Sequence, residues 1–147
     1  MKNELHGYRY IEKAIVGFDG KNFYEGCYKG KIYLVLMDKD IWLLSNEIIT
    51  NRSRKYRDGY LTDITLNKLD DLMLSKMYAT YKENEYEVQR VYRRLKKIEL
   101  LARKDKLEED FRLGFEDDIY ERITHKIITK EEIENIRIER KSVYNQF

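Results

Sequence analysis

The chain has 147 residues, with 29 Lys and Arg against 27 Asp and Glu, and charged residues make up 38% of it. This length suits one compact domain, and the near-balance of charge, +2 overall, argues against a strongly basic module dedicated to nucleic acid. No apolar run approaches the 18 or so residues of a membrane-spanning helix, and the polar first ten residues lack the pattern of an export signal, so we expect no membrane partner.

The first 60 residues predict an antiparallel β-meander of about four strands. Short β-favouring runs alternate with turn dipeptides, and Asp19-Gly20 between two such runs is a strong hairpin signal. We expect the strands at residues 8–18, 23–28, 31–37 and 41–44. Every residue from 32 to 37 is apolar, so that strand should be central and covered on both faces, on one of them by helices.

Residues 45–65 predict a basic connector with one extra strand at 48–50. From residue 66 the apolar spacing becomes three and four, which favours helices at 66–81, from 84 to about 105 or 113, at 115–126 and from 129 onward. Asn84 with Glu87 and Thr129 with Glu132 are capping boxes, and Gly114 is a helix stop. The apolar line of the second helix includes Leu95, that of the third includes Ile119 and Tyr120, and His125 is expected near a helix C-terminus. The expected fold class is α+β: a sheet region with a basic connector (1–60) and a helical region of three to four helices (61–147), packed as one compact domain.

Two basic segments are candidate binding sites for a partner or for nucleic acid. On the expected second helix, four cations fall within a sector of about 60° opposite the apolar line, with Arg94 beside them: Arg90, Arg93, Lys97 and Lys104. Such a stripe can follow phosphates. The alternative is a solvated helix face.

The other segment lies in the expected connector and mixes cations with aromatic rings: Arg52, Arg54, Lys55, Tyr56 and Arg57. Arginine and tyrosine side chains of this kind can stack on bases. The alternative is a mobile charged connector.

The remaining polar residues predict no catalytic residue, metal site or cofactor. The acidic runs 108–110 and 116–118 lack the alternating spacing and central Gly of a calcium loop and are expected on helix surfaces. His6 and His125 have no spaced ligand set, and the single Cys27 cannot form an internal disulfide, which fits a reducing cytoplasm. A further interpretation is that the acidic end of the chain mimics nucleic acid in a partner's basic groove.

Composition gives the functional hypothesis. Pro is absent and Gly occurs 7 times, whereas Lys, Ile and Asn, whose codons are A/T-rich, are abundant, which indicates a low-GC bacterium or a phage or mobile element within one. The 13 Tyr residues favour a protein interface. We therefore predict a small non-enzymatic, cytoplasmic binding protein that inhibits a host defence complex, for example an anti-CRISPR-type inhibitor docking on a host protein or nucleoprotein surface. The alternatives are a nucleic-acid-binding regulator using residues 52–57 and 90–104, then an enzyme, and a housekeeping protein of a low-GC bacterium; no oligomeric state is indicated.

Overall fold

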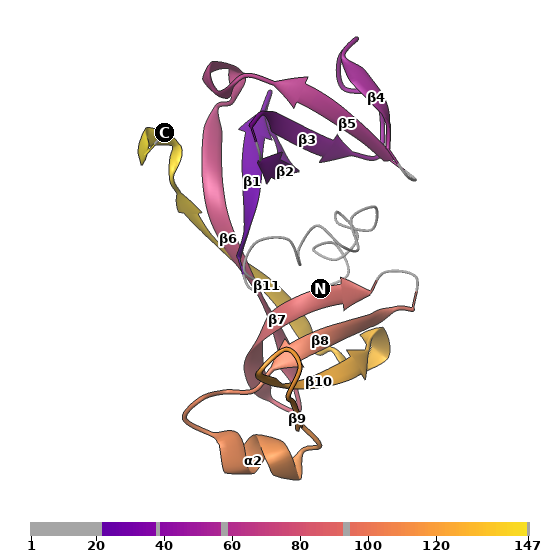
Figure 1. The fold of residues 1–147 in the computed structure, drawn as a ribbon, viewed down its shortest axis with the longest axis vertical. Helices are drawn as coiled ribbons and strands as arrows, with labels where there is room; N and C mark the ends of the chain where they lie inside the picture. The colour runs from indigo at the N-terminus through magenta and orange to yellow at the C-terminus, as the bar shows by residue number, and fades with distance from the viewer. Residues whose placement is uncertain (1–21, 38, 57–58, 93–94, 147) are drawn as a thin grey trace.

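The computed structural model describes residues 22–146 apart from 38, 57–58 and 93–94, and this part of the chain is almost entirely β-structure (Figure 1). The first strands are β1 (Asn22–Tyr28), β2 (Lys31–Met37), β3 (Ile41–Ser45), β4 (Ser53–Tyr56) and β5 (Gly59–Ile64). The later strands are β6 (Asp71–Tyr81), β7 (Asn84–Tyr92), β8 (Lys97–Leu101), β9 (Glu116–Asp118), β10 (Ile123–Thr129) and β11 (Asn135–Ser142). The α-helix of the described part is α2 (Leu107–Arg112), and short 3₁₀ turns are η2 (Leu66–Lys68), η3 (Lys130–Glu132) and η4 (Tyr144–Gln146). The α+β prediction, with a helical region at 61–147, is wrong.

All eleven strands belong to one antiparallel sheet in the order β4-β5-β3-β2-β1-β6-β7-β8-β10-β9, and β11 pairs with β6 off this path. β6 joins two halves. Its residues 71–76 pair with β1, its residues 78–81 pair with β7, and β11 pairs along residues 73–80. Figure 1 shows the N-terminal half, β1 to β5, at one end of β6 and the C-terminal half, β7 to β10 with α2, at the other. No helix in the described part is long and apolar enough to cross a membrane.

The predicted strands at 23–28, 31–37 and 41–44 match β1, β2 and β3. Lys29 and Gly30 both have positive φ, 50° and 79°, which is the two-residue turn that their spacing predicts. The predicted strand at 8–18 and the Asp19-Gly20 turn lie outside the described residues. The predicted connector is wrong, because residues 53–64 form β4 and β5 and residues 48–50 form no strand.

Only the middle of β2 is buried from both faces, by residues of strands and turns rather than of helices, whereas Ile32 is 47% exposed. The adjacent residues Leu34 and Val35 are 1% and 0% exposed, and they point to opposite faces. Leu34 joins the larger core cluster, which also contains Phe23, Tyr86 and Leu100 and so extends into the C-terminal half. Val35 joins a smaller cluster on the other face.

The predicted helix at 66–81 is wrong because its spacing fits both periods. Met73, Met77 and Tyr81 are four residues apart, which is one helical turn and equally two strand repeats. Ser75 and Ala79 between them are also buried, so every second residue faces the core and the segment is β6. A turn at residues 82–83, with φ of 49° and 66°, closes the β6–β7 hairpin without a glycine.

The predicted second helix is wrong because a β-bulge imitates helical spacing. The register shifts between Val88 and Arg90, so Val88 and Val91 both reach the core although they are three residues apart. Asn84 opens β7 rather than a helix. Leu95, expected in the core, is 65% exposed in the turn before β8.

The remaining predicted helices shrink to a short helix and turns. α2 has six residues and is followed by Gly114 at φ 98°, so Gly114 acts as the expected stop. Residues 115–126 contain β9 and the start of β10 instead of a helix. Thr129 and Glu132 do form a capping box, but it opens the three-residue turn η3, which leads into β11.

Candidate docking site

The cations of the first basic segment are engaged within the fold. Arg52 pairs with Asp63, the guanidinium of Arg54 lies 4.8 Å from the centre of the Trp42 ring, and Lys55 lies over Tyr60. Tyr56 is half-buried and packs against the larger core cluster. Arg57 lies outside the described residues. The segment is therefore the folded end strand β4 rather than a mobile connector.

The second basic segment is not a helix stripe. Arg90 lies in β7, Lys97 opens β8 and Lys104 lies in the loop before α2. Arg93 and Arg94 lie outside the described residues. Arg90 forms ion pairs with Glu99 at 3.6 Å and with Glu121 at 2.8 Å, so its charge is compensated within the protein.

The clearest exposed feature of the described part is the turn between β9 and β10, residues 119–122, which we call the hairpin tip. Its Ile119 is 79% exposed and its Tyr120 is 94% exposed, the highest values among the exposed large hydrophobic side chains of the described residues. Moving a large apolar side chain out of water lowers the free energy of the system. The hairpin tip therefore presents two side chains that a partner can bury.

Local hydrogen bonds fix the backbone of the hairpin tip. The Asp118 carboxylate accepts the backbone N–H groups of Tyr120 at 3.0 Å and of Glu121 at 3.1 Å. The Thr124 hydroxyl donates to Asp117 at 2.6 Å across the base of the hairpin. These hydrogen bonds fix the turn before binding, so less conformational entropy is lost when a partner contacts Ile119 and Tyr120.

Charged side chains from three strands support the hairpin tip from the sheet. Glu121 contacts Arg90 of β7, Arg90 faces the buried carboxylate of Glu99 on β8, and Glu99 bonds to His125 Nδ1 on β10. Arg90 Nε and Glu99 Oε1, 3.6 Å apart, have no hydrogen bond among the described residues, so ionic attraction joins them. Burial opposes the charge of Arg90, but its contacts with Tyr92, Glu121 and Glu99 outweigh burial and raise its pKa. Arg90 is a positioning residue for the hairpin tip.

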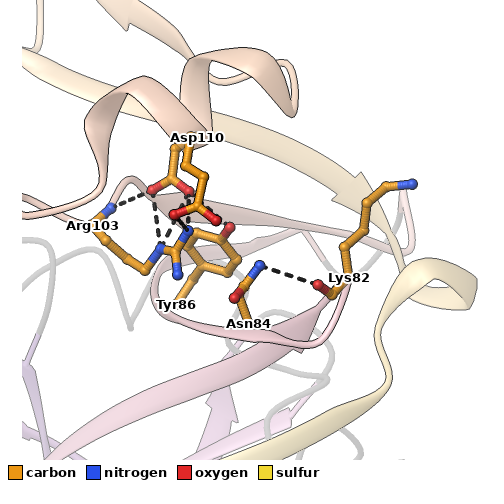
Figure 2. A network of polar contacts seen from close by, with 6 residues as sticks. Lys82, Asn84, Tyr86, Arg103 and Asp110 are labelled. Atoms are coloured by element: carbon orange, nitrogen blue, oxygen red, sulfur yellow. Dashed lines mark hydrogen bonds and ion pairs between the residues drawn. The ribbon is translucent and has the colours of Figure 1, made fainter.

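A second network holds α2 and the start of β9 against β7 (Figure 2). The fully buried Asp110 accepts hydrogen bonds from the Tyr86 hydroxyl at 2.9 Å, from the Arg103 backbone N–H at 2.7 Å and from the Arg103 guanidinium at 2.7 Å. Figure 2 shows the three side chains converging, with the Arg103 guanidinium 4.9 Å from the centre of the Tyr86 ring. Phe115 stacks on Tyr86 with ring centres 4.9 Å apart.

The network sets two opposite pKa shifts. Burial alone would raise the pKa of Asp110, but the hydrogen bonds from Arg103 and Tyr86 outweigh burial, so this pKa lies below its ordinary value. Burial raises the pKa of Tyr86, and the hydrogen bond to Asp110 adds to it, so that this pKa is about 12. Asp110 is therefore a charged anchor and Tyr86 a neutral donor.

The surroundings of the hairpin tip are acidic. Within residues 116–122 four carboxylates stand against one cation, Arg122, and Arg90 of β7 pairs with the last of the four: Glu116, Asp117, Asp118 and Glu121. The run 116–118 was expected on a helix surface and instead forms strand β9. Of the run 108–110, Glu108 and Glu109 are exposed on α2 as expected, whereas Asp110 is buried. The hairpin tip thus combines an apolar apex with negative charge.

A polar hollow beside these elements has carboxylates that are already paired with cations of the fold. It has a volume of about 450 Å³ and is lined by Tyr78, Glu85 and Glu87 together with the loop at 101–104. Arg137 binds Glu85 at 2.6 Å and stacks on Tyr78, and Lys76 pairs with Glu87. Within the described part, no three His, Cys, Asp or Glu side chains gather to hold a metal ion.

Comparisons with protein-family models, curated proteins and solved structures found no match. The site therefore rests on the residues of this chain. Sequence reasoning placed Ile119 and Tyr120 on the apolar line of a helix, because no Gly, Pro or Asn marks the turn that exposes them. His125 was expected at a helix end and instead pairs with Glu99.

Proposed function

We propose that the chain acts by binding a protein partner through the hairpin tip. The observation that carries the proposal is the exposure of Ile119 and Tyr120 on a turn whose backbone is fixed by Asp118. Tyr is enriched among the few residues that supply most of the binding energy of protein interfaces. The negative charge around the apex favours a basic, apolar-lined surface on the partner.

The biological role that we propose is inhibition of a host defence complex in the cytoplasm, in the manner of an anti-CRISPR-type inhibitor encoded by a phage or mobile element. Complexes that hold nucleic acid present basic channels, because Lys and Arg neutralise the phosphates. An acidic apex with two apolar side chains suits such a channel. The A/T-rich composition supports the phage or mobile-element origin.

A nucleic-acid-binding regulator is the second candidate. The exposure of Arg54 and Lys55 on the end strand β4, each beside an aromatic ring, favours it. Binding that neutralises several phosphates should lose orders of magnitude in affinity between about 50 and 200 mM salt. Binding through the hairpin tip should lose far less.

The test is capture of a partner from a low-GC host lysate, with and without nuclease, by the parent protein and by two variants. Ile119→Ser/Tyr120→Ser removes the apolar apex, and Ile48→Ser removes an apolar side chain that is 64% exposed in the N-terminal half. We expect the parent and Ile48→Ser to retain the same partner after nuclease treatment and the apex variant to lose it. Equal capture by all three proteins, or capture only without nuclease, would overturn the proposal.

A further inference from the structure

The two ends of the sheet carry opposite charge. In the strand order of the sheet, the first strand is β4, which bears Arg54 and Lys55, and the last is β9, which bears Glu116 and Asp117. All four side chains are exposed. Among the described strands, β4 pairs only with β5 and β9 only with β10, so each leaves one backbone edge without a strand partner. An open edge is a template for a further strand.

Both faces of each end strand carry its charge. Because successive residues of a strand point to opposite faces, Arg54 and Lys55 place a cation on each face of β4. Glu116 and Asp117 place a carboxylate on each face of β9 in the same way. If β4 lies beside β9, each cation of β4 faces a carboxylate of β9 on the same face of the sheet, which stabilises pairing. If β4 lies beside another β4, or β9 beside another β9, like charges face one another, which destabilises pairing.

The outer edge of β11 offers no such discrimination. This strand has three cations and one carboxylate, but Arg137 pairs with Glu85 and Arg140 with Glu25 within the protein. Lys141 and Glu139 then place opposite charges two residues apart on one face. An approaching strand of either sign would therefore meet attraction and repulsion together. The charge pattern singles out the pair β4 and β9.

We propose that β4 of one copy of this chain adds to β9 of the next copy, so that the molecules associate head to tail. The contact joins two different surfaces, and each associated pair still has one free β4 and one free β9. Such a heterologous contact continues into an open series or closes into a ring. β4 has four residues and β9 has three, so the contact is short and we expect weak association that depends on charge. Ile119 and Tyr120 take no part, so the inference does not rest on the proposed function.

The first test is the mass of the protein in solution over a range of concentrations, measured by sedimentation at two salt concentrations. The Debye length is about 30 Å at 0.01 M and about 3 Å at 1 M ionic strength. At low salt the average mass should rise with concentration and pass that of a dimer, and at high salt it should return to that of a monomer. A monomer at every concentration in low salt would overturn the proposal.

The second test exchanges the charges. Arg54→Glu/Lys55→Glu has two acidic end strands, and Glu116→Lys/Asp117→Lys has two basic ones. Each should be monomeric alone, whereas their equimolar mixture should associate. The control Lys104→Glu/Lys106→Glu makes the same charge change at exposed residues away from both edges and should associate like the parent. A mixture of two folded variants that stays monomeric would contradict the pairing.

Single substitutions test whether a double variant fails to associate only because it is less stable. Arg54 stacks on Trp42 and Asp117 accepts the Thr124 hydroxyl, so the double variants remove contacts of the monomer. Lys55→Glu and Glu116→Lys leave both contacts in place and should show the same reciprocal behaviour in a smaller degree. Tyr120→Ser should associate like the parent, which separates a failure of this inference from a failure of the docking proposal.

Discussion

The two halves of the sheet are stabilised differently. The N-terminal strands bury apolar residues on both faces, with Phe23, Val35 and Leu43 each 0% exposed. The buried carboxylate of the N-terminal half, Glu25 of β1, lies beside β6 and β11, and it accepts hydrogen bonds from Ser75 and Arg140. The C-terminal half has apolar packing and, in addition, two ionic networks centred on Asp110 and Glu99. The Asp110 network holds α2 against β7, and the Glu99 network supports the hairpin tip through Arg90.

The comparison shows why the exposed apolar residues are unevenly distributed. Among the described residues of the N-terminal half, the exposed large hydrophobic ones are Ile32 and Ile48. The C-terminal half exposes a larger set: Leu95, Leu107, Phe111, Ile119, Tyr120 and Ile127. Buried ionic anchors position loops without using apolar surface, so apolar side chains remain available for a partner.

The largest expected effect breaks the anchor of the C-terminal half. Asp110→Ala removes the acceptor of Tyr86 and Arg103, and loss of one member of a buried ion pair costs about 3 to 5 kcal/mol. Chemical denaturation should show this loss, which is a large part of ordinary protein stability. The neighbouring Glu109→Ala, at a side chain 52% exposed, should change stability by less than about 0.5 kcal/mol. Equal effects of the two substitutions would mean that Asp110 is not an anchor.

A slightly smaller effect distinguishes the strand arrangement from the helical one. Leu100 is fully buried, and Leu100→Ala should cost about 2 to 5 kcal/mol by leaving a cavity. Leu95→Ala, at a side chain 65% exposed, should cost less than about 0.5 kcal/mol. On the predicted helix Leu95 lay on the apolar line, so a large loss for Leu95→Ala would favour that arrangement over the sheet. Thermal melts of the two variants make the comparison.

The smallest of the three effects concerns alkaline pH. The pKa of Tyr86 is raised from 10.0 to about 12, so its neutral form contributes stability that is fully present below about pH 10 and is lost as pH rises through about 12. The full contribution corresponds to about 3 kcal/mol. The stability difference between the parent and Tyr86→Phe should be constant below pH 10 and shrink between pH 10 and 12. Parallel pH profiles would show that Tyr86 titrates normally.

Sequence alone could predict β1 to β3, because turn dipeptides separate short β-favouring runs there. It missed β4 and β5, which it took for a connector, and it failed again from residue 66 onward, where the fourfold spacing of Met73, Met77 and Tyr81 fits a helix and a strand alike. The bulge after Val88 then imitated a helical interval. Such ambiguities are settled by pairing partners, which local spacing does not contain.

The candidate site was still less accessible to sequence reasoning. Its supports join residues far apart in the chain, with 24 positions between Tyr86 and Asp110 and 31 between Arg90 and Glu121. Arg90 was singled out as a phosphate contact, which stays a prediction, and its pairing with Glu121 was not foreseen. The acidic run at 116–118 did mark the base of the hairpin tip, as a charge pattern without a visible turn.

The central position of β6 has a consequence for how the protein is made. Its residues 73–80 need β11, whose residues 135–142 are synthesised after every other described strand. Pairing between segments so distant in sequence is slow, because a long loop must close before any contact forms. During synthesis one edge of β6 therefore stays open until the ribosome has passed residue 142, and an open edge can pair with other nascent chains. The charged residues of β11 cover that edge only at the end, so the edge of β6 is the last part of the described sheet to gain its partner.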